Sequence, residues 1–259
     1  MTDRKDLDRD GVSLSYLEAG SGDPALLFIH GWCCDGTHWR NQLAALEGDH
    51  RVLALDLRGH GESGKPDQDY TIGGFAEDVA WLCQEIGLER PLIVGHSMGG
   101  VIALNMVRRW PQLAQAVVFV DAGITPFPEQ FKPMMDSMIE ALKSPRYQDV
   151  AASFVKRFLF RPESPPQLRD EVAQRMAGTP QRVMHTALAS SFSEENLTFG
   201  PLPVPSLFVR AATLPATEDE LKERYPGMEV VSVDAAHFIQ LEKPEELNAI
   251  LRRFIGALP

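Results

Sequence analysis

Short apolar runs alternate with longer amphipathic stretches along most of this chain of 259 residues. Residues 25–29 are continuously apolar, as expected for a strand that is covered on both faces of its sheet. Residues 72–86 instead repeat their apolar positions at helical spacing, so that these positions share one face. Further strands are predicted at residues 12–18, 51–56, 91–94, 116–120, 205–209 and 228–233, and further helices at residues 100–107 and 244–255. This alternation predicts an α/β fold with a mostly parallel sheet and helices on both faces.

The pattern changes between about residues 125 and 200. This segment is predicted to be helical, with interruptions at prolines 126, 128, 133, 145, 162, 165 and 166. Because strand character returns after it, we interpret it as a helical cap, residues 125–200, inserted into a core formed by residues 1–124 and 201–259. Apolar side chains within the segment predict a pocket under the cap: Phe131, Met134, Met135, Met138, Phe154, Phe158 and Phe160.

The sequence Gly-His-Ser-Met-Gly at residues 95–99 stands between a predicted strand and a predicted helix. A serine in the pattern G-x-S-x-G at such a junction is typical of a nucleophile elbow, a strained turn that exposes the hydroxyl at the edge of the sheet. Glycines are needed at positions 95 and 99 because a Cβ atom there would collide where helix and strand nearly touch. Ser97 is therefore predicted to be a nucleophile.

Acyl transfer needs two backbone N–H groups that stabilise the negative oxygen of the intermediate. One normally belongs to the residue after the nucleophile, and the other to a loop that follows an earlier strand. Met98 and Trp32 occupy these two positions, since Trp32 follows the apolar run at residues 25–29 within the sequence His-Gly-Trp. Their backbone N–H groups are the predicted oxyanion hole.

A general base is predicted near the end of the chain. His237 follows the strand at residues 228–233 and precedes the last helix, a position from which its ring could reach Ser97. The histidines at 50, 60 and 185 lie on a polar loop, in a glycine-rich turn and in the predicted cap, and none has a comparable context.

Together these pieces closely resemble the α/β-hydrolase superfamily, in its capped serine esterase, C–C hydrolase and lactonase branch. The resemblance covers nearly the whole chain and is carried by His30-Gly31, DLRGHGES at residues 56–63, GHSMGG at 95–100, AHF at 236–238 and LEKP at 241–244. It implies the α/β-hydrolase fold, with a mostly parallel eight-stranded sheet and a catalytic triad of serine, histidine and an acid. These motifs are specific for the fold, but they do not identify the substrate, because the same fold hosts many reactions.

The acid departs from the family pattern. Relatives usually carry it a few residues beyond the seventh strand, where this chain has Leu214, and a leucine cannot orient an imidazole or stabilise its cation. Asp121, at the end of the strand at residues 116–120, is the favoured replacement, because some family members carry their acid after the sixth strand. The alternatives are Glu218 or Asp219, close to the vacated position, or a dyad of serine and histidine alone.

Composition narrows the possible partners. A net charge of −11 without a basic stripe argues against a nucleic-acid partner. The N-terminus is charged, and the sequence has no run of 18 apolar residues, so neither a signal peptide nor a membrane span is predicted. Cys33, Cys34 and Cys83 fit neither a disulfide framework nor a zinc site, and we expect a cytoplasmic protein that needs no cofactor or metal.

These observations predict a serine hydrolase that acts on a small-molecule carboxylic ester or lactone through Ser97, His237 and Asp121. A serine at the elbow argues against haloalkane dehalogenase and epoxide hydrolase chemistry, for which the family uses aspartate. Hydrolysis of a C–C bond in a diketone remains an alternative, as does a cofactor-independent dioxygenase, whose Gly-Trp-Cys loop is similar to residues 31–33. A hormone-receptor role, known in plant relatives of the fold, is a further alternative.

Overall fold

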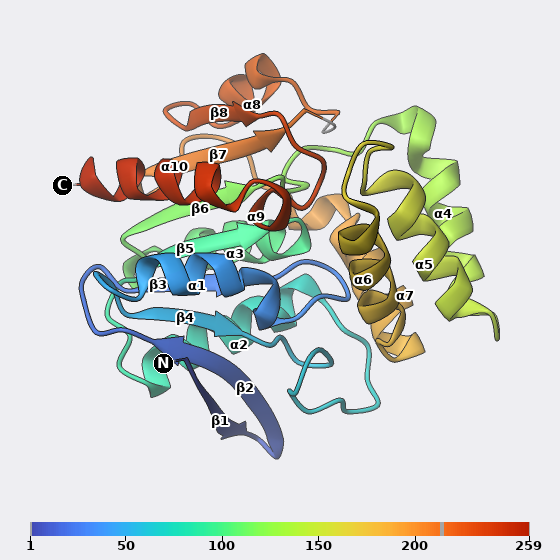
Figure 1. The fold of residues 1–259 in the computed structure, drawn as a ribbon, viewed down its shortest axis with the longest axis horizontal. Helices are drawn as coiled ribbons and strands as arrows, with labels where there is room; N and C mark the ends of the chain where they lie inside the picture. Colours follow the sequence, from blue (N-terminus) through green and yellow to red (C-terminus); the bar gives the residue numbers. More distant parts are fainter. Residues whose placement is uncertain (1, 213–214, 259) are drawn as a thin grey trace.

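A computed structural model describes residues 2–212 and 215–258 of the chain. Eight strands in this part form one sheet in the order β1-β2-β4-β3-β5-β6-β7-β8 (Figure 1). β1 pairs antiparallel with β2, and β2 pairs antiparallel with β4. All other neighbouring strands pair in parallel. The strands are β1 (Asp3–Arg9), β2 (Val12–Ala19), β3 (Leu26–Ile29), β4 (Val52–Leu55), β5 (Leu92–His96), β6 (Ala116–Val120), β7 (Ser206–Ala211) and β8 (Glu229–Val233). The structure confirms the predicted fold class.

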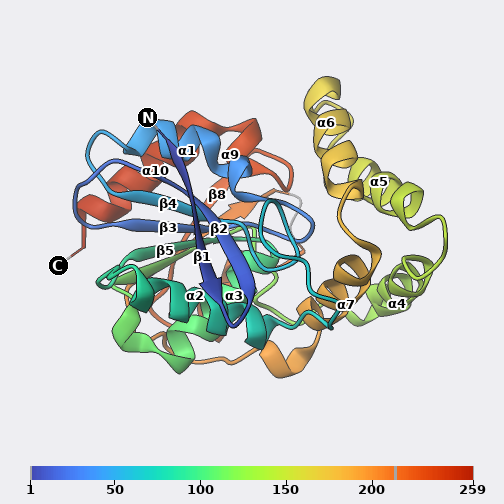
Figure 2. The ribbon, with the colours of Figure 1, turned by 90° about the horizontal axis from the view of Figure 1, so that it is seen from below.

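Helices cover both faces of the sheet. In Figure 2, α1 (Arg40–Leu46) and α10 (Pro244–Gly256) lie on one face, and α2 (Ile72–Glu85) and α3 (Met98–Arg109) lie on the other. The side chains of β3 divide between two apolar clusters: Leu27 packs on the side of α2 and α3, and Phe28 packs on the side of α1 and α10. All four residues of β3 are therefore buried, which explains the continuous apolar run in the sequence.

The N-terminal edge of the sheet differs from the prediction. The strand predicted at residues 12–18 is the second strand, since Asp3–Arg9 forms β1 and pairs with β2 over seven residues. The side chains of β1 are mostly exposed and charged, so the strand has no apolar alternation by which a sequence pattern could reveal it. Backbone pairing and ion pairs hold it, including Lys5 with Glu18 at 2.6 Å.

Four helices lie between β6 and β7 in the chain: α4 (Lys132–Ala141), α5 (Tyr147–Phe158), α6 (Pro166–Ala177) and α7 (Gln181–Ser191). They stand together beyond the carboxyl ends of the parallel strands (Figures 1 and 2). Pro133 and Pro166 lie in the first turns of α4 and α6, where a proline is tolerated, so these prolines mark where helices begin. Two short helices, α8 (Glu218–Arg224) and α9 (Ile239–Glu242), follow β7 and β8 in the chain.

Specific hydrogen bonds join the helical segment to the loop after β3 and to the start of α2. The Trp32 indole donates to the Met184 carbonyl of α7 at 2.8 Å, and the backbone N–H of Ile72 donates to Ser190 Oγ at 2.9 Å. No helix in the described ranges has both the length and the apolar character that crossing a membrane requires.

Candidate active site

Ser97 joins β5 to α3 in a strained backbone conformation, with φ 54° and ψ −120°. Such a conformation is unfavourable for a residue with a side chain and persists only where the surroundings impose it. A Cβ atom at Gly95 would run into the backbone of Gly99, and one at Gly99 would run into the carbonyl of Ile29. The glycines therefore allow the close approach of helix and strand that forces the turn, as the motif predicts.

His237 and Asp121 meet beside this turn. The ring Nδ1 of His237 lies 2.7 Å from Asp121 Oδ2, and the carboxylate is 2% exposed. Its second oxygen accepts a hydrogen bond from the backbone N–H of Ala211 at 2.9 Å. Asp121 directly follows β6, which pairs in parallel with the elbow strand β5. The carboxylate is thus fixed on two sides and can hold the histidine ring in one orientation.

The alternative acids occupy other environments. Glu218 and Asp219 begin α8, as the sequence suggests, and neither lines the cavity that contains Ser97. Glu218 forms an ion pair with Lys222 one turn along the same helix, with 2.6 Å between Oε1 and Nζ. Leu214 lies outside the described residues. Of the three candidate acids, the structure brings only Asp121 to His237.

Trp32 and Met98, the residues of the predicted oxyanion hole, line the same cavity as Ser97. Within the described part of the chain, the backbone N–H groups of Trp32 and Met98 donate no hydrogen bond. His30 positions the Trp32 loop: Leu57 N–H donates to His30 Nε2 at 3.0 Å, so Nδ1 carries the hydrogen and donates to the Gly31 carbonyl at 2.8 Å. Burial lowers the pKa of His30, which keeps this neutral form.

His96 is a site residue that the sequence argument did not single out. Its Nε2 donates to the backbone carbonyl of His237 at 2.9 Å, and the two rings are 4.6 Å apart between centroids. Burial, and then the neighbouring His237, lower the pKa of His96 well below its usual value, so the ring stays neutral. Its place inside the elbow motif was the available signal, but the pattern G-x-S-x-G does not specify the side chain at this position, so it could not predict a contact across 141 residues.

The loop that carries His237 is also held by Glu242 and by the segment after α5. Glu242 accepts hydrogen bonds from the Ala236 N–H and the Ser164 hydroxyl, both at 2.7 Å. Arg161 donates to Asp234 at 2.7 Å and to the Ala235 carbonyl at 2.9 Å. The sequence contained a signal for Glu242, because it belongs to the LEKP motif. It contained none for Ser164 and Arg161, which belong to the inserted segment.

Ser97, His237 and Asp121 line one cavity of about 660 Å³. Much of its wall is apolar and comes from the helical segment, including Phe127, Phe131, Met134, Met135, Phe154, Phe158 and Phe192. The structure therefore brings most of the predicted pocket residues together. Two of them lie elsewhere: Met138 is buried outside this wall, and Phe160 stacks on Phe238 with ring centroids 5.2 Å apart.

Ser97 Oγ makes no hydrogen bond in the described residues, although His237 lines the same cavity. Hydrogen bonds between a nucleophile and its base are often long before substrate binds and shorten in the complex. The arrangement offers a hydroxyl, a histidine oriented by a carboxylate and two unpaired N–H donors at one cavity. This set of groups can carry out nucleophilic acyl transfer.

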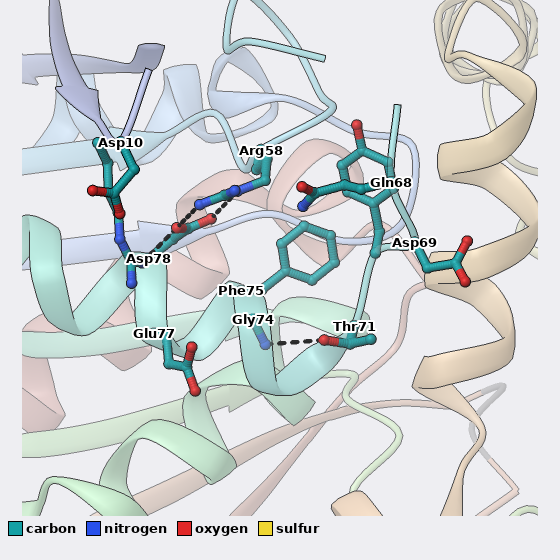
Figure 3. Close-up of a pocket in the computed structure, with 11 residues that line it drawn as sticks. Asp10, Arg58, Gln68, Asp69, Thr71, Gly74, Phe75, Glu77 and Asp78 are labelled. Atoms are coloured by element: carbon teal, nitrogen blue, oxygen red, sulfur yellow. Dashed lines mark hydrogen bonds and ion pairs between the residues drawn. The ribbon is translucent and has the colours of Figure 1, made fainter. Parts of the chain in front are cut away.

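A second, smaller hollow of about 310 Å³ lies outside this cavity, beside α2 (Figure 3). Charged side chains line it, and the buried carboxylate of Asp78 pairs with Arg9 and Arg58. Across residues 2–212 and 215–258, no three His, Cys, Asp or Glu side chains are grouped so that they could hold a metal ion. The three cysteines are buried and free.

Comparisons with known proteins match the fold and most of the chain. A family model described as alpha/beta hydrolase fold matches residues 24–244. A haloalkane dehalogenase from Sphingobium indicum is 28% identical over 297 aligned residues, covering 99% of this chain and 96% of that protein. An uncharacterised protein from Mycobacterium tuberculosis is 40% identical over 113 residues, and this match spans 44% of the chain and 33% of that relative's length.

Solved structures show the same architecture. The enol-lactonase from Burkholderia xenovorans superposes with a TM-score of 0.84 at 20% identity, covering 97% of this chain and all of that one. A thermophilic esterase from Thermogutta terrifontis gives a TM-score of 0.83 at 22% identity, covering 99% of each chain. At these identities the likeness shows the fold alone.

Proposed function

This chain belongs to the α/β-hydrolase family, and from this premise we propose that it is a serine hydrolase that cleaves carboxylic esters or lactones. The observation that carries the proposal is the contact between His237 and Asp121, 2.7 Å, beside the strained turn of Ser97. A carboxylate that fixes one ring nitrogen leaves the other free to act as a base toward the cavity. The named esterase and lactonase structures share the fold and lend support at that level.

In the proposed reaction, His237 Nε2 takes the hydroxyl proton of Ser97 while Oγ attacks the substrate carbonyl. The electron pair of the broken C=O π bond moves to the oxygen, which the Trp32 and Met98 N–H groups stabilise. The intermediate collapses when the protonated His237 gives its proton to the departing alkoxide. Water then attacks the acyl-enzyme, with His237 acting again as base, and releases the acid and free Ser97.

The identity of the nucleophile separates this proposal from the chemistry named for some relatives. Haloalkane dehalogenases and epoxide hydrolases of this family use an aspartate at the elbow, whereas this chain carries Ser97. A serine forms an acyl ester with a carbonyl carbon, and this ester can be hydrolysed by the same base. Full-length similarity to a haloalkane dehalogenase, at 28% identity, therefore supports a shared scaffold rather than a shared reaction.

We further propose that residues 125–200 act as a cap that shapes the acyl pocket. Phenylalanine and methionine side chains from this segment form much of the cavity wall, with the Phe154 and Phe158 rings 5.4 Å apart. Burial of each methylene group in such a wall contributes about 0.8 kcal/mol. Hexanoyl esters should therefore have a higher kcat/KM than acetyl esters of the same alcohol, by at least tenfold.

The test is a panel of activated esters and lactones of graded chain length, assayed with wild type and Ser97→Ala. We expect Ser97→Ala to lose at least about 10⁴-fold in kcat, because the nucleophile is removed. Its thermal unfolding midpoint should stay close to that of wild type, since the hydroxyl makes no hydrogen bond in the described residues. Activity within tenfold of wild type would overturn the assignment.

A further inference from the structure

One cationic side chain stands in the wall of the cavity that holds Ser97. Among the described residues that line it, Arg224 is the single lysine or arginine. It is the last residue of α8, and the carboxylates of Asp121, Glu129 and Glu220 are the acidic groups of the same wall. An arginine in a largely apolar binding site normally fixes the orientation of a ligand that carries negative charge.

The contacts of Arg224 hold its guanidinium group in one place. Nε donates to Glu220 Oε1 at 3.1 Å, one turn earlier on the same helix. Cζ lies 4.8 Å from the centroid of the Phe199 ring, a cation–π distance. Neither Nη group has a hydrogen-bond partner in the ranges that the structure describes. The two Nη groups therefore remain available as a fork for a carboxylate.

Each acidic group of the wall has a partner. Asp121 bonds to His237, Glu129 pairs with Lys132 at 2.7 Å, and Glu220 pairs with Arg224 itself through Nε. The chain as a whole carries a net charge of −11, so its long-range field disfavours anions. A binding site for an anionic substrate on this molecule needs a local cation, and Arg224 supplies one at the cavity that contains the nucleophile.

We propose that Arg224 binds a carboxylate at the far end of the substrate, so that the preferred substrates are half-esters or lactones that bear a second, ionised carboxyl group. The inference rests on the proposed serine hydrolase function and names its substrate class. The substrate carboxylate accepts hydrogen bonds from the two Nη groups of Arg224. Nε of Arg224 continues to donate to Glu220, and this bond fixes the orientation of the guanidinium group.

The experiment compares matched neutral and anionic substrates. In one pair, 4-nitrophenyl hydrogen adipate is set against its methyl ester, which places the charge on the acyl side. In the other pair, 4-hexanoyloxybenzoate is set against its methyl ester, which places the charge on the leaving side. The measured quantity is the ratio of kcat/KM for the anion to kcat/KM for the neutral ester, determined at low and at high salt.

We expect a ratio of about ten or more for wild type in one of the two pairs, as a charge-assisted hydrogen bond implies. Arg224→Gln should lower this ratio to one or below, and Arg224→Lys should leave it in between, because a lysine keeps the charge and loses the fork. Glu220→Gln should keep or raise the ratio. The matched control is Lys222→Gln, which removes a cation from the same helix outside the cavity wall and should change the ratio by less than about twofold.

A binding measurement separates this inference from the proposed reaction. Ser97→Ala protein is titrated with monomethyl adipate and with dimethyl adipate, in the presence and absence of the Arg224→Gln substitution. Tighter binding of the monoanion that depends on Arg224 supports the inference even if no ester is hydrolysed. A wild-type ratio near one in both substrate pairs, or a ratio that Arg224→Gln leaves unchanged, would overturn it while leaving hydrolysis itself intact.

Discussion

Asp78 and Asp121 are both buried carboxylates, with exposed fractions of 0% and 2%, but their partners differ in kind. Asp78 accepts hydrogen bonds from two guanidinium groups. The Arg9 group lies at 2.5 Å, and the Arg58 group, shown in Figure 3, lies at 2.6 and 2.9 Å. Asp121 accepts one bond from the Ala211 backbone and one from His237. Arginine stays charged at every pH of interest, whereas histidine changes charge near neutrality.

The difference fits a structural task for Asp78 and, in the proposed reaction, a chemical task for Asp121. The two arginines come from β1 and from the turn after β4, so the Asp78 cluster ties separate parts of the chain to α2. Guanidinium groups stay protonated in proteins, so neither partner of Asp78 can act as a base. The ring of His237, in contrast, lies between a fixed carboxylate and an open cavity, where a proton can move.

The largest effect should come from Asp121→Asn. The variant keeps the shape of the side chain, but its amide stabilises the wrong tautomer of His237 and cannot balance the imidazolium that forms during attack. We expect kcat/KM for activated esters to fall by about 10³- to 10⁴-fold near neutral pH, with KM changed little. The measurement is a pH profile of kcat/KM for both proteins.

Glu218→Gln and Asp219→Asn are the controls for this variant. Both residues lie at the start of α8, outside the cavity, and Glu218 is paired with Lys222. Each change should cost less than about tenfold in kcat/KM, as a surface change remote from the reacting groups does. If one of these changes lowered kcat/KM by about 10³-fold or more and Asp121→Asn left kcat/KM nearly unchanged, the acid would lie after β7 instead.

Asp78→Asn tests the other side of the comparison. It removes the negative charge between two arginines whose side chains are 20% and 19% exposed. The free energy of unfolding should fall by about 3 kcal/mol, the lower end of the range for breaking a buried ion pair, because both cations keep some contact with water. Urea denaturation at pH 7 measures this change.

The same Asp78 variant should keep its kcat/KM within about twofold of wild type at 25 °C, because the cluster touches none of the proposed reacting groups. A variant that unfolds at the wild-type urea concentration but loses most of its activity would contradict the division of tasks between the two carboxylates.

The sequence predicted the parts of the molecule that follow from local pattern. The buried strands appear as apolar runs, and the elbow appears as glycines around Ser97, because both are set by contacts within a few residues. Asp121 was favoured because Leu214 stands at the usual position of the acid, because some family members carry the acid after the sixth strand, and because the ends of adjacent parallel strands lie close together. The charged edge strand β1 was missed, since its stability comes from pairing with β2.

Contacts between segments far apart in the chain could not be predicted. His96 reaches the carbonyl of His237 across 141 residues, and Ser164 reaches Glu242 across 78. A hydroxyl or an imidazole in a sequence does not state which partner it will have, because many arrangements could satisfy it. The same holds for Arg224, whose place in the cavity wall depends on the packing of α8 after β7.

The smallest effect concerns His60, a buried histidine that can be compared with His237. Its Nδ1 donates to the carbonyl of Arg58 at 3.0 Å, and its ring packs on Phe75 and on His30. Unlike His237, it has no carboxylate partner within the described residues. Burial, and then the neighbouring His30, lower the pKa of His60 to about 3.

A histidine with a pKa of about 3 when folded and about 6.5 when unfolded binds more protons in the unfolded state between these two pH values. Its contribution to stability is therefore fully present above pH 6.5 and is lost as the pH falls, at about 1.4 kcal/mol per pH unit. Between pH 7 and pH 5, His60 should account for a loss of about 2 kcal/mol in the free energy of unfolding.

The variant His60→Asn keeps a donor for the Arg58 carbonyl and has no proton to gain. Its loss in the free energy of unfolding over this pH interval should therefore be smaller by about 2 kcal/mol. Urea denaturation of both proteins at pH 7, 6 and 5 measures the two slopes. Equal slopes would mean that the His60 ring gains its proton over the same pH range in the folded and in the unfolded protein, and would contradict the prediction.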